Sequence, residues 1–326
     1  MKGDEITDSC LSVSEYIPGY QVLVGLHVLN ILIAVPGNAI TCFTIYKSPK
    51  LHKQATYLLI SSVSIADLLI ALLNEPLQII VVIMVCNIKD ESELLKSFWS
   101  KACSMSGFTG YLFATASVLS VAGVTMDRFV YIVFPYKYER FFTKKRAYVY
   151  LAITWVTSFA FGLGTSYFLD VMMLSKCFFG LVMSSTIVSF SANLYFYKMT
   201  LIKTQQMPTM NSAVMTGMKH QRQLSFTILL IAIAFGVLWL PHAFIELFIR
   251  VLGPPYKPAF QAGYWWTLCI SSLNSSVNVL IYAKKNITLR NEILKVFRCC
   301  SSQTVPNNAF SFVDEIQISK PPPSQF

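Results

Sequence analysis

The sequence predicts an all-α membrane protein: a seven-transmembrane helix bundle with a short amphipathic helix after the seventh span. Hydrophobic residues make up 54% of the 326 residues and charged residues only 13%, so a water-soluble fold could not cover its apolar surface. Seven apolar segments are long enough to cross about 30 Å of hydrocarbon as helices. Because seven is odd, the two ends of the chain are expected on opposite sides of the membrane.

The predicted spans follow one another with short connections. They cover residues 20–46, 56–86, 102–134, 147–169, 178–202, 223–252 and 259–283. The polar, acidic segment 1–19 precedes them and lacks the basic-then-apolar order of a cleaved signal peptide. We therefore divide the chain into an amino end (1–19), a seven-span domain (20–283), an amphipathic juxtamembrane helix (284–300) and a disordered tail (301–326).

Basic residues gather in the loops on one side of the predicted bundle. They follow span one, precede span four, separate spans five and six, and follow span seven, whereas the opposite loops are nearly balanced in charge. The positive-inside rule makes the first side cytoplasmic, so the amino end is expected outside a plasma membrane. The net charge of +10 occurs in short runs, which indicates topology signals and argues against nucleic-acid binding.

An amphipathic pattern follows the seventh span. Apolar residues alternate with lysine and arginine over residues 284–298, which predicts a helix lying on the inner leaflet of the bilayer. Cys299 and Cys300 end this helix. A cysteine pair in that place is a candidate palmitoylation site, and two unmodified thiols are the alternative.

Asp67 is the only carboxylate that the sequence places clearly in mid-membrane, where a charge is costly. Its expected partners are Asn38, Ser117, Asn274 and Asn278, from spans one, three and seven. A cluster of oxygens around one acid suits a small hard cation such as Na⁺. A protonated or amide-bonded aspartate that holds helices together is the alternative.

Two further patterns indicate moving parts. Asp127 and Arg128 end span three, where the arginine can pair with its neighbour or swing toward another helix. Phe235, Trp239 and Pro241 lie together in span six, where the proline bends the helix and the two rings share one face. A packed aromatic pair at an incidental kink is the alternative for span six.

Together these residues resemble the rhodopsin-like, class A family of G-protein-coupled receptors, in order from about residue 20 to residue 300. The matching features are Gly37-Asn38, Ala66-Asp67, Cys103 placed 25 residues before Arg128, Asp127-Arg128-Phe129, Trp155, Phe235 to Pro241, Asn274-Ser275, and Asn278 to Tyr282.

The resemblance implies roles for these positions. Asp67, Ser117, Asn274 and Asn278 would form a sodium pocket, with allosteric Na⁺ as the only expected ion and no other cofactor. The activation switch would comprise Asp127, Arg128, Phe235, Trp239, Pro241 and Tyr282. A disulfide would join Cys103 to Cys177. The implied partners are a heterotrimeric G protein, an extracellular ligand and, through serines and threonine in the tail, arrestin. The protein would not be an enzyme.

The ligand is expected in the outer half of the bundle. Trp239, His242 and Glu246 share one helical stripe, and Tyr111 and Tyr264 could face them. His242 bonded to a neighbouring helix and a solvated Glu246 are the alternatives. In the family, an acid on span three binds amines and a lysine in span seven binds retinal. Gly110 and Ser272 stand at these positions, so neither a biogenic amine nor an opsin chromophore is expected.

Two departures from the family pattern affect the switch. Val279 replaces the proline of the span-seven motif, which should straighten the end of that helix. Gln221 stands near the usual acid of span six, so Arg128 would lack a charged clamp and appreciable basal activity is expected. A receptor-like protein that does not signal, and a membrane transporter, are the alternative functions. No metal site beyond sodium is expected, because the histidines are dispersed.

Overall fold

The computed structural model describes residues 17, 19–87, 92–164, 180, 191, 195, 198–199, 202, 212–252 and 257–302. All regular elements within these ranges are helices. They are α2 (Tyr20–Lys47), α3 (Pro49–His52), α4 (Ala55–Leu69), the π-helical segment η1 (Ile70–Asn74), α5 (Glu75–Asn87), α6 (Glu93–Val133), α7 (Pro135–Phe141), α8 (Lys144–Leu163), α10 (Ser212–Leu252), α11 (Lys257–Ser272), α12 (Asn274–Lys285) and α13 (Ile287–Ser302).

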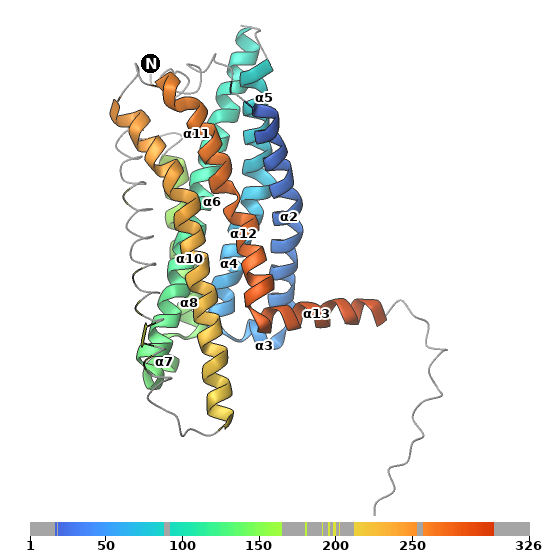
Figure 1. Ribbon diagram of the computed structural model, residues 1–326, viewed down its shortest axis with the longest axis vertical. Helices are drawn as coiled ribbons and strands as arrows, with labels where there is room; N and C mark the ends of the chain where they lie inside the picture. Colours follow the sequence, from blue (N-terminus) through green and yellow to red (C-terminus); the bar gives the residue numbers. More distant parts are fainter. Residues whose placement is uncertain are drawn as a thin grey trace, which may run out of the picture.

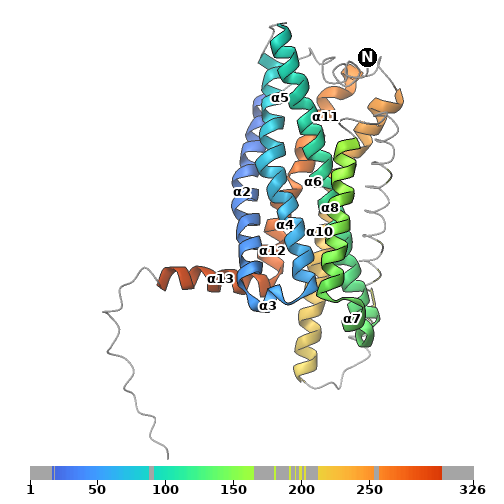
Figure 2. The ribbon, with the colours of Figure 1, turned by 180° about the vertical axis from the view of Figure 1, so that it is seen from behind.

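The long helices run side by side as a bundle, and α13 projects from one end at a steep angle to them (Figures 1 and 2). α6 packs against α4, α5, α8 and α10, while α2 packs against α4 and α12. Many large apolar side chains point outward, including Leu32, Val156 and Val237, each more than 60% exposed. Such a band of exposed apolar side chains is what a helix bundle presents to lipid. The predicted fold class is confirmed.

Within the described ranges, four helices are long and apolar enough to cross a membrane. They are Tyr20–Lys47, Ala55–Asn87, Ser97–Arg128 and Phe226–Ile245, which correspond to predicted spans one, two, three and six. α8 corresponds to span four, and α11 with α12 to span seven. The predicted fifth span lies almost wholly outside the described residues.

Span two contains a π-helical segment between α4 and α5. Pro76 has no N–H group to bond the carbonyl four residues earlier, and the ladder widens over Ile70–Asn74, just before it. A π segment adds about one residue to a turn, so the eight steps from Asp67 to Glu75 turn the helix roughly as far as seven regular steps. Seven steps of ~100° leave the two side chains only about 20° apart around the axis.

Span seven is interrupted at Leu273, between α11 and α12, and not at Val279. α12 continues through Val279, whose backbone N–H group is available to a helix where a proline would have none. The Val279 side chain lies against Gly37 of α2: a Cβ atom added at Gly37 would stand 2.3 Å from Val279 Cγ1. Glycine at position 37 therefore lets the two helices approach closely.

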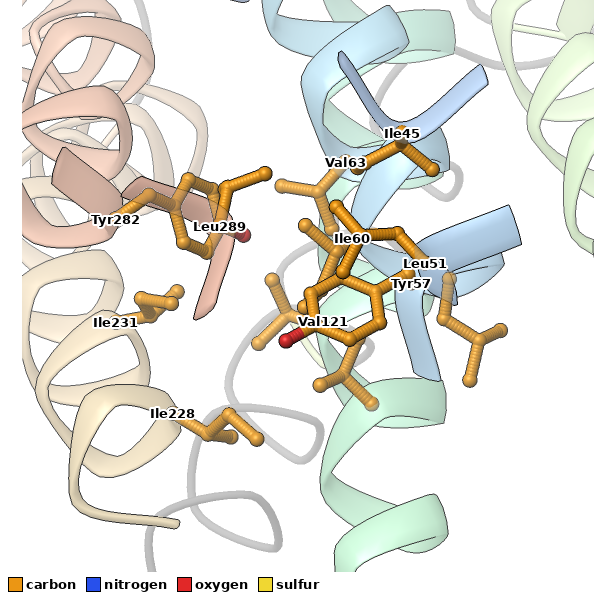
Figure 3. Close-up of a cluster of buried hydrophobic side chains, with 12 residues drawn as sticks. Ile45, Leu51, Tyr57, Ile60, Val63, Val121, Ile228, Ile231, Tyr282 and Leu289 are labelled. Atoms are coloured by element: carbon orange, nitrogen blue, oxygen red, sulfur yellow. The ribbon is translucent and has the colours of Figure 1, made fainter. Parts of the chain in front are cut away.

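One end of the bundle is closed by an apolar cluster that joins seven helices (Figure 3). Tyr282 of α12 packs there with Ile228 and Ile231 of α10, and Leu289 brings in α13. The remaining buried members are Ile45, Leu51, Tyr57, Leu59, Ile60, Val63, Val121 and Val124.

α13 begins at Ile287 because Asn286 caps it, its side-chain Oδ1 accepting a hydrogen bond of 3.1 Å from the backbone N–H of Leu289. Ser48 Oγ donates to Glu292 Oε2 at 2.8 Å, and Lys295 Nζ donates to Glu292 Oε1 at 2.7 Å. These bonds hold the pKa of Glu292 below its ordinary value. The helix is thus attached to Ser48, which follows α2, by a hydrogen bond, and to the apolar cluster through Leu289.

Candidate functional site

Asp67 is completely buried in the centre of the bundle. Asn278 Nδ2 donates to Asp67 Oδ2 at 2.9 Å, and Ser117 Oγ donates to Asp67 Oδ1 at 3.3 Å. The carboxylate therefore ties α4 to α6 and α12, as the sequence analysis expected for Ser117 and Asn278. Asn38 instead donates to the backbone carbonyls of Ala34 and Ser275, at 2.9 and 3.3 Å.

The residues around Asp67 fit a small cation. Asn38, Asn274 and Asn278 each have a buried side-chain oxygen, Oδ1, with no hydrogen-bond partner among the described residues. Buried polar atoms are normally paired, so these three unpaired acceptors would suit a ligand that needs oxygen donors. Na⁺ is such a ligand, since hard cations prefer oxygen. Asn274 is placed nearby on α12 but makes no described contact with Asp67.

Arg128 is folded back onto Asp127 of its own helix. Arg128 Nε and Nη2 donate to Asp127 Oδ2 at 2.9 and 2.6 Å, and both residues are buried. Of the two arrangements expected for this arginine, the structure contains the local pair.

Thr56 and Tyr138 complete this network, and sequence reasoning did not assign either to the site. Thr56 Oγ1 of α4 donates to Asp127 Oδ2 at 2.6 Å and accepts a short hydrogen bond from Arg128 Nη2. Tyr138 of α7 donates from its hydroxyl to Asp127 Oδ1 at 2.7 Å. Burial and the Asp127 carboxylate raise the pKa of the Tyr138 hydroxyl, so it remains a donor at physiological pH. We call these four residues the Arg128 lock.

The span-six residues form a continuous aromatic series. The rings of Phe235 and Trp239 stack at a centroid distance of 5.6 Å, with 15° between their planes. The ring centroid of His242 lies 6.2 Å from that of Trp239 and 5.1 Å from that of Tyr264 of α11. Tyr111 of α6 packs against the same cluster as Phe235 and Trp239. Pro241 lies within α10, six residues beyond Phe235 and two beyond Trp239.

Three of the four candidate ligand residues, Tyr111, His242 and Tyr264, thus lie within the neighbourhood of Trp239. The side chain of the fourth, Glu246, falls outside the described part of the structure. Gly110 lies against span two: a Cβ atom there would stand 3.2 Å from Asn74 Nδ2. A larger side chain at position 110 would have to displace Asn74, which donates to the Ser106 carbonyl at 2.7 Å.

Several assigned positions lie beyond what the structure describes. Cys177 is outside the described residues, so the predicted Cys103–Cys177 disulfide is not tested; Cys103 itself is half-buried on α6. The side chains of Cys299, Cys300 and Gln221 are also outside them. Tyr282 is described, and its ring is buried in the apolar cluster of Figure 3.

The sequence singled out Asp67 as the clearly mid-membrane carboxylate, and the structure adds a second buried acid in span two. Glu75 is completely buried, and its Oε2 lies 2.5 Å from His27 Nδ1. The π segment before it was not predictable from the apolar pattern, and it turns Glu75 inward. A glutamate within an apolar span was the signal that should have prompted this prediction.

A helix bundle with a buried central acid, an arginine pair at the foot of span three and an aromatic hinge in span six defines a seven-helix signalling receptor. The family model for seven-transmembrane receptors of the rhodopsin family matches residues 37–282, and the chain belongs to this family. It is therefore a G-protein-coupled receptor, which binds an extracellular ligand and acts on G proteins, and it is not an enzyme.

Three similar proteins are receptors with different ligands in their names. Melatonin receptor type 1A of Gallus gallus is 22% identical, over 91% of this chain and 86% of its own. Adenosine receptor A3 of Ovis aries is 23% identical, over 86% of this chain and 89% of its own. Neuropeptide FF receptor 2 of Mus musculus is 22% identical, over 89% of this chain and 76% of its own. Similarity at this level does not identify the ligand.

Proposed function

We propose that the receptor lies in the plasma membrane with its amino end outside, and that it signals when Arg128 leaves Asp127 and opens the cytoplasmic end of the bundle. The geometry of the Arg128 lock carries this proposal. The described hydrogen bonds of Arg128 are to Asp127 on its own helix and to Thr56 of α4, while Ile228 and Ile231 of α10 pack with Tyr282 in the apolar cluster. The arrangement described above is then the resting one, and a ligand acts by shifting its population.

The trigger for this shift is the aromatic series around Trp239. A ligand that contacts Tyr111, His242 or Tyr264 would move Trp239 against Phe235, and Pro241 would let the two halves of α10 bend relative to each other. Glu246 extends the same stripe toward the outer surface.

A flat, uncharged ligand with aromatic rings suits this site. Aromatic side chains supply most of the described surface, and Trp239 Nε1 is a buried donor with no partner among the described residues, which would suit an acceptor group on the ligand. Gly110 argues against an amine, because no acid stands there to bind the cation.

Sodium would act as an allosteric ligand at Asp67, with Ser117, Asn274 and Asn278. The cation would neutralise a buried carboxylate that otherwise ties three helices, so its binding would favour one packing of the bundle over the other. Asp67 would supply the charge, and the unpaired amide oxygens would supply the remaining ligands.

Three covalent or regulatory features complete the proposal. A Cys103–Cys177 disulfide would fix the second outer loop, since the outer compartment is oxidising. Palmitoylation of Cys299 and Cys300 would anchor the end of α13 in the inner leaflet. Phosphorylated serines and threonine in the tail would recruit arrestin. Mass spectrometry of the intact protein, with and without reductant and hydroxylamine, tests the first two.

The principal test is guanine-nucleotide exchange on a panel of purified G proteins, with the receptor in lipid nanodiscs. Wild-type receptor is compared with Arg128→Ala, which cannot form the lock or engage the G protein. Basal exchange that disappears in Arg128→Ala supports the proposed switch. Exchange that is equal in both proteins would contradict it. Staining of an amino-terminal tag on intact cells tests the orientation, and ion flux in liposomes tests the transporter alternative.

A further inference from the structure

A second buried acid holds span seven at the point where that helix is interrupted. Glu75 of α5 and His27 and Asn30 of α2 are each at most 1% exposed. Both oxygens of the Glu75 carboxylate are engaged: Oε2 lies 2.5 Å from His27 Nδ1, and Oε1 accepts from Asn30 Nδ2 at 2.5 Å. An imidazole nitrogen and a carboxylate oxygen at this separation are hydrogen-bonded, and the imidazole N–H is the donor to a carboxylate.

The same Asn30 side chain continues to span seven. Asn30 Nδ2 also donates to the backbone carbonyl of Ser272 at 2.9 Å. Ser276 Oγ donates back to Asn30, to its carbonyl at 3.2 Å and to its side-chain Oδ1. Asn30 is therefore bound on both sides of Leu273, the residue at which α11 ends and α12 begins.

The interruption explains why a side chain is needed there. In a regular helix the N–H group of Ser276 would bond the carbonyl of Ser272, four residues earlier. Here it bonds Leu273 instead, at 3.1 Å, so the Ser272 carbonyl is released from the helix. Asn30 supplies the missing donor. Without it, a buried carbonyl would lose a partner at a place that water does not readily reach.

This cluster is separate from the Asp67 site. The hydrogen-bond partners of Glu75 are His27 and Asn30, whereas those of Asp67 are Ser117 and Asn278. Both acids lie on span two and, through the π segment, on nearly the same side of it. Glu75, through Asn30, therefore holds span seven beside Leu273, and Asp67 holds it further along α12, at Asn278.

We propose that His27, Glu75 and Asn30 form a clamp that sets the resting position of α11 and thereby the sensitivity of the receptor to its ligand. They are positioning residues, because none needs to touch the ligand. α11 carries Tyr264, which contacts His242 beside Trp239. Any movement of Tyr264 relative to α10 must be accommodated at the end of α11, where the clamp holds Ser272. The clamp coexists with the closed Arg128 lock, so it stabilises the resting arrangement.

The direct test measures the position of α11 and needs neither a ligand nor a G protein. Spin labels are placed on the outer turns of α2 and α11 of the full-length receptor in nanodiscs, and their distance distribution is recorded. Asn30→Ala removes the side-chain bonds to Ser272 and Ser276 while leaving His27 and Glu75 paired, and it keeps only the Ser276 bond to the backbone carbonyl of residue 30. It is expected to shift or broaden the distribution. Asn87→Ala is the matched control: this asparagine also joins α5 to α2, accepting from the Tyr20 hydroxyl at 3.0 Å, but the bond is exposed.

A charge-exchange pair separates positioning from simple damage to the fold. His27→Glu alone places two acids together, and Glu75→His alone places two imidazoles together, so each should disturb the distribution. The double variant restores one acid and one imidazole and should return it toward wild type. A wild-type distribution in Asn30→Ala would overturn the proposal. So would a folded double variant, judged by its Tm, that is no closer to wild type than the singles.

The functional reading rests on the proposed resting state of the Arg128 lock and is made separately. In the nucleotide-exchange assay, Asn30→Ala is expected to raise basal exchange by about three- to tenfold, the range for loss of one hydrogen bond made only in the resting state. A shifted distance distribution with unchanged exchange would refute the proposed coupling while leaving the clamp in place. The Arg128 switch is tested separately: basal exchange that is lost in Arg128→Ala but kept in Asn30→Ala supports the switch, whatever the distance distribution of Asn30→Ala shows.

Discussion

Replacing Tyr138 by phenylalanine tests the Arg128 lock with the smallest possible change. The substitution removes the 2.7 Å hydrogen bond to Asp127 Oδ1 but keeps the ring, which packs edge-on against Tyr131 at 5.0 Å and stacks on Phe142 at 6.0 Å. A hydrogen bond to a charged group contributes about 1.5–3 kcal/mol. Tyr138 is only half-buried, and Asp127 keeps its bonds to Thr56 and Arg128, so we expect the lower end of this range.

A loss of about 1.5 kcal/mol from the resting state alone multiplies the active population by roughly tenfold while that population is small. Basal nucleotide exchange in nanodiscs should rise by about this factor, and Thr56→Val should act in the same direction. Tyr131→Phe is the matched control, because the Tyr131 ring lies 5.2 Å from the Arg128 guanidinium and keeps that contact without its hydroxyl. Unchanged exchange in Tyr138→Phe, or an equal rise in Tyr131→Phe, would refute the reasoning.

Three further predictions concern packing, sodium and pH. Gly37→Ala should lower the Tm, because the added Cβ atom would overlap Val279 Cγ1 at 2.3 Å and overpacking costs about 1–3 kcal/mol. A second substitution, Val279→Ala, should restore much of the lost stability. A Gly37→Ala protein as stable as wild type would contradict the close contact. Asp67→Asn should abolish any effect of Na⁺, at constant ionic strength, on the Tm, and a sodium effect that persists would place the cation elsewhere. Because the pKa of Glu292 is lowered in the folded protein, its contribution to docking α13 is present above the ordinary value of 4.5 and is lost as the pH falls below it. The protection factor of the Leu289 amide, which is corrected for the intrinsic pH dependence of exchange, should therefore fall in acid, and this fall should be absent in Glu292→Gln. Identical protection-factor profiles in both proteins would contradict the prediction.

Gln221 in place of an acid favours basal activity, whereas the Arg128 lock opposes it. Thr56 and Tyr138 supply hydrogen bonds that hold the Asp127–Arg128 pair from α4 and α7. Gln221→Glu should lower basal exchange if a clamp from α10 is the missing element. Equal exchange in Gln221→Glu and wild type would indicate that Thr56 and Tyr138 suffice.

Local patterns were enough to predict the seven-helix fold and to single out the residues proposed for the switch. Apolar length identifies a membrane helix because each span must satisfy its own backbone hydrogen bonds in lipid. Asp67, Arg128, Trp239 and Pro241 stood out because a charge, an arginine pair or a proline is unusual at those depths. Thr56 and Tyr138 did not stand out, because a threonine and a tyrosine near a helix end are common and only the approach of α4 and α7 gives them a partner.

The sequence by itself determined that this chain is a seven-helix receptor, since the spacing of apolar segments, prolines and buried charges reports on each helix separately. Only the tertiary structure decided which side chains meet. The π segment before Pro76 turns Glu75 inward toward His27, and the interruption at Leu273 releases the carbonyl that Asn30 binds. The partners that Glu75 and the Ser272 carbonyl find there depend on how helices distant in the sequence pack together, and a one-dimensional pattern carries no record of that packing.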